Sequence, residues 1–431
     1  MLYSPDSFSP LTPGPENSSK DTSGGFIAGQ LRLGVDSQLI KFWQYIPARG
    51  TANLASLFLA VFYSRDLGVT NRGIIAAIMS FSVISIIALL GGTTLTLRQV
   101  GLRALDPELK KSLCTLLPLL VFAAFGLYIL SIYIYSNFKS EIPSNLIYLS
   151  LIYFFASASQ YLAHEFLLSQ KNFRAAGKIE ISTIVLQILS YITLSTLDKF
   201  SSAINLLLSF SFPYLVISLY VFKRYFSSGI IRFGLPQLFL RETKGKHSLG
   251  VALNFLDRLD RIFIAWFFPS SILGQYATMS GFLSAARFFP DAISRIRVAG
   301  YRFDVDGRFQ KPLVMVSLAG LLIAAGAIGV LVARYFISWS LGPEWLMSIP
   351  IFIFFWAQEV ARGVFQFLAN HHIKNGQPTK AHNSSLTLAI SILPALLIFS
   401  QSFGIIGVPI GFLFCYTFSI LATRKVWVRS A

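Results

Sequence analysis

Apolar segments long enough to cross a lipid bilayer follow one another along almost the whole chain. A membrane-spanning helix needs about 20 predominantly apolar residues. Twelve segments satisfy this requirement, at residues 44 to 64, 73 to 95, 113 to 136, 145 to 168, 179 to 197, 201 to 222, 248 to 268, 273 to 295, 312 to 336, 346 to 369, 382 to 402 and 404 to 423. With 54% hydrophobic residues and a mean hydropathy of +0.62, the chain is expected to be an all-α, polytopic integral membrane protein of about 12 transmembrane helices.

Lysine and arginine are distributed unequally between the two sides of such a protein. The set of connections that includes both termini holds all but four of the basic residues that lie outside the spans. The opposite set holds only Arg65, Arg72, Lys139 and Lys199. Because cytoplasmic connections carry the excess of basic residues, we expect a plasma-membrane protein with both termini in the cytoplasm. The same rule accounts for the net charge of +17, so nucleic acid is not an expected partner.

The chain is expected to divide into two lobes. Residues 1–40 are rich in Ser, Pro and Gly and are predicted to form a disordered cytoplasmic tail. A basic cytoplasmic linker at 223–247 then separates a six-helix lobe at 41–222 from a second one at 248–431. An offset of 201 residues aligns Gly73 with Gly274 and Phe166-Leu167 with Phe367-Leu368. Because this offset spans an even number of helices, the lobes are predicted to be parallel repeats.

Four predicted spans carry polar side chains gathered toward one side. A charged side chain at the centre of a lipid-exposed helix costs roughly 2.5–3.5 kcal/mol, so such residues face a bundle interior or a watery cavity. At about 100° per residue, each set falls within an arc of about 60° to 160°. The sets are Arg49, Asn53, Ser56 and Tyr63; Asn254, Asp257, Arg258, Asp260 and Arg261; Ser280, Ser284, Arg287, Asp291 and Ser294; and Gln358, Glu359, Arg362, Gln366 and Asn370.

Two interpretations of these stripes stay open. Oppositely charged residues at helical spacing, such as Asp257 with Arg261 and Glu359 with Arg362, can be buried pairs that hold helices together. Four stripes in a chain with only 13% charged residues favour a shared polar cavity instead. The formal charges of that cavity sum to about zero, although Arg49 has no acidic partner in its own span. Its guanidinium is therefore available for a phosphate or for a carboxylate of the other lobe.

Ionisable residues within the spans are candidates for ion coupling. His164 can titrate near neutral pH, and Glu165 follows it directly. The other candidates are the carboxylates Asp257, Asp260, Asp291 and Glu359.

Enzymatic chemistry has no support in the sequence. We find no Gly-rich phosphate loop, no catalytic triad and no metal-ligand spacing, and Cys114 and Cys415 lie in different halves. We therefore expect neither a cofactor, nor a bound metal, nor enzymatic activity.

Three groups of short motifs carry a family resemblance. They are Tyr63-Ser64-Arg65-Asp66-Leu67-Gly68 with Gly73; Leu259-Asp260-Arg261 with Leu273-Gly274-Gln275-Tyr276; and Leu341-Gly342-Pro343-Glu344-Trp345 with Asn375-Gly376 and Phe403-Gly404-Ile405-Ile406-Gly407. The chain resembles the oligosaccharide flippases, or O-antigen transporters, of the multidrug/oligosaccharidyl-lipid/polysaccharide exporter superfamily. That superfamily also contains multidrug and toxin extrusion antiporters and lipid-linked peptidoglycan precursor flippases.

The resemblance implies alternating access of a central cavity between two six-helix lobes. The implied substrate is a polyprenyl-pyrophosphate-linked oligosaccharide, moved from the cytoplasmic to the outer leaflet for surface polysaccharide and lipopolysaccharide biosynthesis. Membrane lipids and glycan-assembly proteins are the other implied partners. Basic residues of spans one and eight in that family match Arg49 and Arg287. The full set of candidate substrate-binding residues is Arg49, Asn53, Arg261, Arg287, Gln358, Arg362 and Gln366.

An ion-coupled antiporter of drugs or small molecules, with the same fold, is the alternative. Asp257, Asp260 or Glu359 would then exchange protons or sodium. Drug antiporters typically carry an acidic residue in span one, whereas this chain has Arg49 there.

Overall fold

The computed structural model describes residues 24–100, 107–139, 142–170, 172–197, 201–226, 234–283, 312–374 and 378–428. The chain divides into two units, residues 1–41 and 42–431. In the first unit, residues 24–41 are helical. This part of the predicted disordered tail is therefore helix instead. All that follows concerns the second unit.

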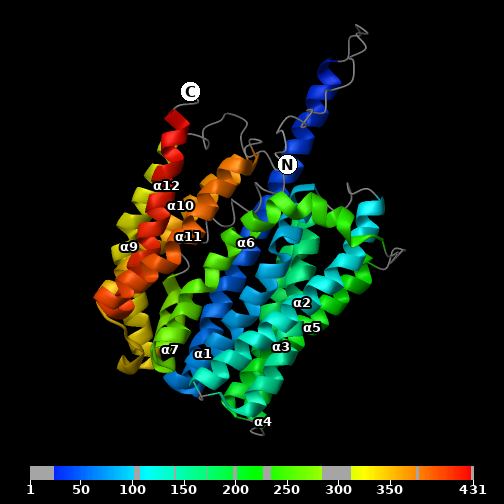
Figure 1. The fold of residues 1–431 in the computed structure, drawn as a ribbon. Helices are drawn as coiled ribbons and strands as arrows, with labels where there is room; N and C mark the ends of the chain where they lie inside the picture. The colour runs from blue at the N-terminus through cyan, green and yellow to red at the C-terminus, as the bar shows by residue number, and fades with distance from the viewer. Residues whose placement is uncertain are drawn as a thin grey trace, which may run out of the picture. The chain divides into compact units, whose positions relative to one another are not determined.

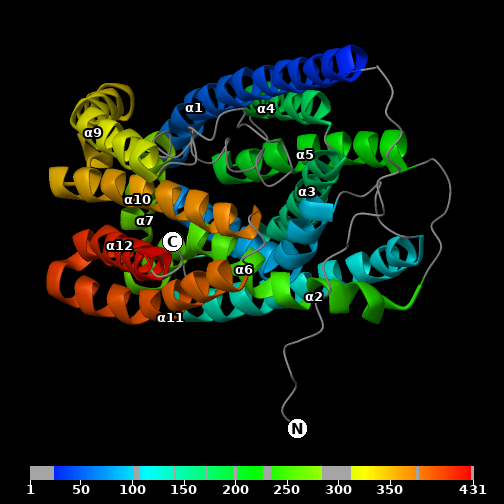
Figure 2. The same ribbon diagram turned by 90° about the horizontal axis from the view of Figure 1, so that it is seen from above.

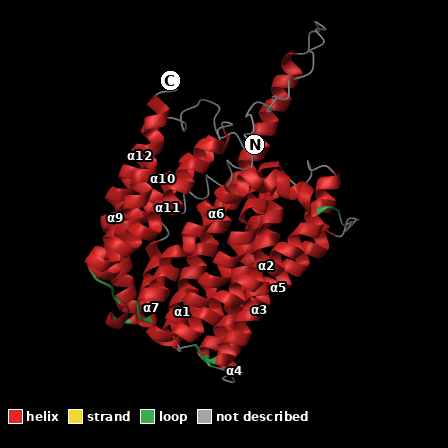
Figure 3. Cartoon of the chain, viewed as in Figure 1, coloured by secondary structure: helices red, strands yellow, loops and turns green. Residues whose placement is uncertain are grey.

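The described residues form helices and no strand (Figure 3). The expected all-α fold is confirmed. The longer helices are α1 (Gly24–Val100), α2 (Pro107–Lys139), α3 (Ser144–Ser169), α4 (Phe173–Leu197), α5 (Ser202–Phe226), α6 (Pro236–Phe267), α7 (Ser270–Leu283), α9 (Pro312–Leu341), α10 (Ile349–Lys374), α11 (Pro378–Phe403) and α12 (Gly407–Val428).

Six stretches of the described helices are long and apolar enough to cross a membrane. Two of them, Pro47–Leu97 with 51 residues and Asn383–Leu421 with 39, have the length of two crossings each at about 20 residues per crossing. A glycine in the left-handed region interrupts each stretch, Gly68 with φ 69° and Gly404 with φ 58°. Glycine adopts this backbone conformation at no steric cost because it lacks a Cβ. The chain is a multi-pass membrane protein.

The described parts of the predicted linker at 223–247 are mostly helical. Helix α5 continues to Phe226, and α6 already begins at Pro236. The start of α6 is fixed to α2 by two hydrogen bonds. The amide of Gly234 donates to Thr115 Oγ1 at 3.0 Å, and the amide of Phe239 donates to Ser112 Oγ at 3.0 Å. The described start of α6 therefore packs against α2.

The helices pack mainly with others of the same half of the chain. Helices α3, α4 and α5 contact one another, as do α10, α11 and α12, with α9 against α10 (Figures 1 and 2). Near the ends of α2 and α6 the halves also meet. Trp266 of α6 packs against Phe81 of α1 and Tyr135 of α2, with ring centroids 6.2 and 5.6 Å apart. Lys139 of α2 donates to the carbonyl of Phe268 at 3.1 Å.

Candidate functional site

A cavity of about 540 Å³ lies between the two halves. Helices α1, α3 and α5 form its wall on the N-terminal side, and α6 and α7 form it on the C-terminal side. Its described polar lining consists of Arg49, Asn53, Ser56, Tyr63, Arg72, Tyr153, Ser157, Gln160, Tyr161, Tyr214, Arg258, Arg261 and Thr278. The predicted polar face of the first span, from Arg49 to Tyr63, thus lines one cavity together with Arg261.

The described lining of the cavity is positively charged. It includes four arginines, at positions 49, 72, 258 and 261, and no carboxylate among the residues that the structure describes. Asp260, next to Arg261 in sequence, lies outside the lining because it accepts a hydrogen bond from Tyr276 at 3.0 Å in the protein interior. The near-zero charge expected from the sequence also counted Asp257, Arg287 and Asp291, whose side chains lie outside the described residues, so it stays a prediction.

Two of these arginines have neutral partners in the described part of the chain. The guanidinium of Arg72 donates to the hydroxyl of Tyr63 at 3.3 Å and lies over its ring, 4.8 Å from the centroid. Arg261 Nη2 donates to Ser280 Oγ at 2.8 Å. Hydroxyls orient a guanidinium without neutralising it. Within the described residues, these two contacts therefore leave the positive charge of Arg72 and Arg261 uncompensated. The sequence placed Arg72 in a short connection between two spans, and in the structure its side chain is buried against Tyr63.

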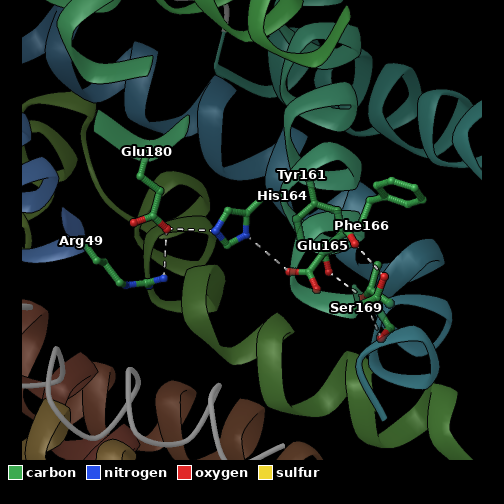
Figure 4. A network of polar contacts seen from close by, with 9 residues as sticks. Arg49, Tyr161, His164, Glu165, Phe166, Ser169 and Glu180 are labelled. Atoms are coloured by element: carbon green, nitrogen blue, oxygen red, sulfur yellow. Dashed lines mark hydrogen bonds and ion pairs between the residues drawn. The ribbon is translucent and has the colours of Figure 1, made fainter. Parts of the chain in front are cut away.

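Arg49 belongs to a network across three helices (Figure 4). Its Nη1 lies 3.3 Å from Glu180 Oε1 of α4, and the same oxygen lies 2.9 Å from His164 Nε2 of α3. His164 Nδ1 lies 4.0 Å from Oε1 of the buried Glu165. Glu180 was absent from the sequence-based candidates. Its signal in the sequence is that it is the sole carboxylate within residues 179–197.

The α3 and α5 side of the cavity is aromatic and uncharged. Tyr153, Tyr161 and Tyr214 line it together with Ser157 and Gln160. These groups are positioned by neighbouring side chains, as in the contacts between Tyr161 and Thr94 at 2.9 Å and between Ser157 and Ser82 at 2.9 Å. Such a surface offers hydroxyl and amide groups for hydrogen bonding to a neutral, hydroxyl-rich ligand.

An apolar groove of about 310 Å³ adjoins the cavity. Leu57 of α1 lines both. The groove lies between α1 on one side and α7, α9 and α10 on the other, and its lining includes Leu54, Phe58, Val332 and Trp356. Leu54, Phe58 and Val332 are each about 60% exposed, so the groove opens on the outer surface of the helices. A polar cavity and an apolar groove thus share one wall.

The residues of α10 that were predicted to bind substrate do not belong to the described lining of this cavity. These residues are Gln358, Arg362 and Gln366. Glu359 and Arg362 are buried and form an ion pair at 3.3 Å. For this pair the structure shows the buried-pair geometry that was one of the two interpretations of the polar stripes.

Several residues of the predicted polar stripes lie outside the described part of the structure, among them Ser284 and Ser294 and the side chains of Asn254 and Asn370. Arg287 and Asp291 lie outside the described residues. Asp257 is within α6, but its side chain is outside the described part.

The fold resembles known transporters. No family model and no curated protein sequence matches the chain. The lipid II flippase MurJ, in an inward closed conformation, is similar with a TM-score of 0.62 and 13% identity, over 88% of this chain and 86% of that one. The eukaryotic MATE transporter AtDTX14 is similar with a TM-score of 0.61 and 11% identity, over 92% of this chain and 97% of that one. A mutant of the Vibrio cholerae MATE transporter VcmN is similar with a TM-score of 0.57 and 16% identity, over 92% of this chain and 98% of that one. The chain therefore has the all-α fold that a lipid flippase shares with MATE transporters.

Proposed function

We propose that the protein is a flippase for a polyprenyl-pyrophosphate-linked oligosaccharide. It moves this lipid from the cytoplasmic to the outer leaflet of the plasma membrane by alternating access, for surface polysaccharide biosynthesis. The observation that carries the proposal is the cavity wall with four arginines and no carboxylate among its described residues. Guanidinium groups bind phosphate oxygens through paired hydrogen bonds, so such a wall selects a phosphorylated ligand.

The remaining parts of an amphiphilic substrate also match the site. Sugar hydroxyls would contact the uncharged polar side near Tyr153, Gln160 and Tyr214. The polyprenyl chain would leave through the groove that meets the cavity at Leu57. A charged headgroup crosses hydrocarbon very slowly because it loses its hydration. A polar cavity that opens to each side in turn removes most of this barrier while the chain stays in lipid.

The structural neighbours support a transporter, and one of them supports a lipid substrate. MurJ is described as a lipid II flippase. The MATE neighbours favour the alternative, an ion-coupled antiporter of drugs or other small molecules. In that case Asp257, Asp260 or Glu359 would carry the coupling ion, and the last two are buried in the C-terminal half. The arginines weigh against a cationic drug as the cargo because like charges in the cavity repel it.

Ligand binding to the purified protein in nanodiscs separates the two functions. We expect geranylgeranyl pyrophosphate to bind much more tightly than geranylgeraniol, which has the same chain and no charge. Arg261→Ala should weaken pyrophosphate binding about tenfold or more, since it removes charge-assisted hydrogen bonds. The matched control is Arg65→Ala, which removes an exposed arginine outside the lining.

Cells that lack the protein should accumulate lipid-linked oligosaccharide on the cytoplasmic face. The Arg65→Ala variant should restore surface glycan and Arg261→Ala should not. Equal binding of the pyrophosphate and the alcohol, or normal surface glycan together with drug sensitivity, would favour the antiporter.

A further inference from the structure

The carboxylate of Glu180 is shared between a cavity arginine and a histidine. One oxygen, Oε1, lies 3.3 Å from Arg49 Nη1 and 2.9 Å from His164 Nε2. Arg49 lines the cavity, whereas Glu180 and His164 are not part of the described lining. Glu180 therefore contacts the guanidinium of Arg49 without lining the cavity itself (Figure 4).

The contact between Glu180 and Arg49 is one that a phosphate can replace. Charge-assisted N–H···O hydrogen bonds are usually about 2.7–2.9 Å long, and the 3.3 Å separation involves one guanidinium nitrogen. A guanidinium carries five N–H donors in a planar fork, and phosphate oxygens accept two of them side by side. A multiply charged anion in the cavity thus competes with a carboxylate whose contact to Arg49 Nη1 is 3.3 Å long.

Displaced from Arg49, the Glu180 carboxylate is stabilised by a positive charge on its other neighbour, His164. The Glu180 side chain is only 19% exposed, and a partly buried charge without a counter-charge is unfavourable. His164, itself 14% exposed, is the titratable group next to it. An imidazole with an unperturbed pKa of about 6.5 takes up a proton readily near neutral pH.

The surroundings of His164 accommodate a positive charge. The groups that face it are Glu180 of α4 at 2.9 Å and Glu165 of its own helix at 4.0 Å, with Arg49 of α1 beyond Glu180. No ion pair joins His164 to α2 or α5 within the described residues. The neutral and the protonated ring thus differ mainly in how they interact with two carboxylates and one arginine.

We infer that Glu180 is an internal counter-ion of Arg49, and that an anion entering the cavity displaces it toward a protonated His164. The proton comes from solvent and adds to an imidazole nitrogen. No bond between heavy atoms changes. This role rests on the proposed function, because it requires an anionic ligand in the cavity. Glu180 and His164 are positioning residues that couple occupancy of the cavity to proton uptake.

Calorimetry on the full chain in nanodiscs tests this coupling, with geranylgeranyl pyrophosphate as the probe. The heat of binding in two buffers of different ionisation enthalpy gives the number of protons taken up. In the wild type we expect uptake near pH 7 and tighter binding as the pH falls from 8 to 6.5. Glu180→Gln should bind the probe several-fold more tightly at pH 8, because Arg49 loses its competitor. His164→Gln should bind more weakly at pH 6.5, and both variants should take up fewer protons.

Matched variants make the outcomes distinct. Titration of the probe itself is common to all variants, so differences between them report the protein. Glu108→Gln removes the same charge from an exposed pair with Lys111 and should behave as wild type. If Glu180→Gln is unstable, His164→Gln provides the test alone.

Weaker binding by Glu180→Gln, or wild-type proton uptake in both variants, overturns this inference. The proposed function survives that result as long as Arg261→Ala still weakens binding. Failure of the wild type to prefer the pyrophosphate over the alcohol overturns both.

Discussion

Gly73 of α1 and Gly274 of α7 lie against one another, backbone to backbone. A Cβ on Gly73 would lie 3.1 Å from the amide nitrogen of Gly274, and a Cβ on Gly274 would lie 3.1 Å from that of Gly73. These are the two residues that the 201-residue offset aligns. A reciprocal contact between equivalent residues is what a two-fold axis produces. The contact places these two glycines side by side, and the parallel arrangement of the repeats stays a prediction.

A side chain at either glycine should disrupt this contact. The Cβ of Gly73→Ala would overlap the carbonyl of Ser270, and that of Gly274→Ala the carbonyl of Val69. Because backbone atoms cannot move aside cheaply, we expect each substitution to destabilise the protein by about 1–3 kcal/mol. Thermal unfolding in detergent measures the effect.

Gly126→Ala is the control for this pair. Gly126 lies within α2 and has no heavy atom within 4 Å of the added Cβ. Alanine there should leave the melting temperature unchanged or raise it slightly, since glycine is the poorer helix former. Equal melting temperatures for all three variants would mean that α1 and α7 are not in close contact.

Two ion pairs with the same spacing differ in their surroundings. Glu359 and Arg362 on α10 have side chains only 2% and 3% exposed, whereas Glu108 and Lys111 on α2 are 62% and 29% exposed. Both pairs are at i,i+3. Removal of one partner from a buried pair leaves an uncompensated charge and costs about 3–5 kcal/mol. An exposed pair contributes less than about 1 kcal/mol.

We therefore expect Glu359→Gln to lower the melting temperature far more than Glu108→Gln. Thermal unfolding in detergent checks this difference. A melting temperature close to that of wild type for Glu359→Gln, combined with a loss of transport, would instead favour the ion-coupling role considered for Glu359.

The apolar groove should determine how strongly the prenyl chain contributes to binding. Val332 lies in the groove and is 62% exposed, so Val332→Trp fills the groove without disturbing the core. We expect several-fold weaker binding of geranylgeranyl pyrophosphate and unchanged binding of inorganic pyrophosphate. The control is Val185→Trp on α4, an exposed valine outside the groove. An equal loss for both ligands would contradict a chain-binding role for the groove.

The sequence predicted the helices well because a bilayer requires a long apolar segment for each crossing. Side-chain placement was predicted less well near the ends of the helices. Glu180 is the second residue of its predicted span, where a carboxylate can reach water. Helix α4 begins earlier, at Phe173, so Glu180 lies about two turns inside it.

Arg72 was missed for a related reason. It follows Gly68, and a glycine in the left-handed region normally ends a helix. Here the helical backbone resumes at once and turns Arg72 back toward Tyr63. The charge of the cavity wall depends on such local geometry, which apolar periodicity does not encode.

The geometry of Arg72 leads to the last prediction. Its guanidinium both donates to the Tyr63 hydroxyl and lies over the Tyr63 ring. Lysine has a compact ammonium group and cannot make the planar, bidentate contacts of arginine. Arg72→Lys should therefore keep the charge of the cavity and still weaken pyrophosphate binding several-fold, as measured by calorimetry. Arg65→Lys, at an exposed position in the same motif, should bind as wild type. Unchanged affinity in Arg72→Lys would mean that the wall acts by net charge alone, and Arg72→Gln would then lose affinity while Arg72→Lys kept it.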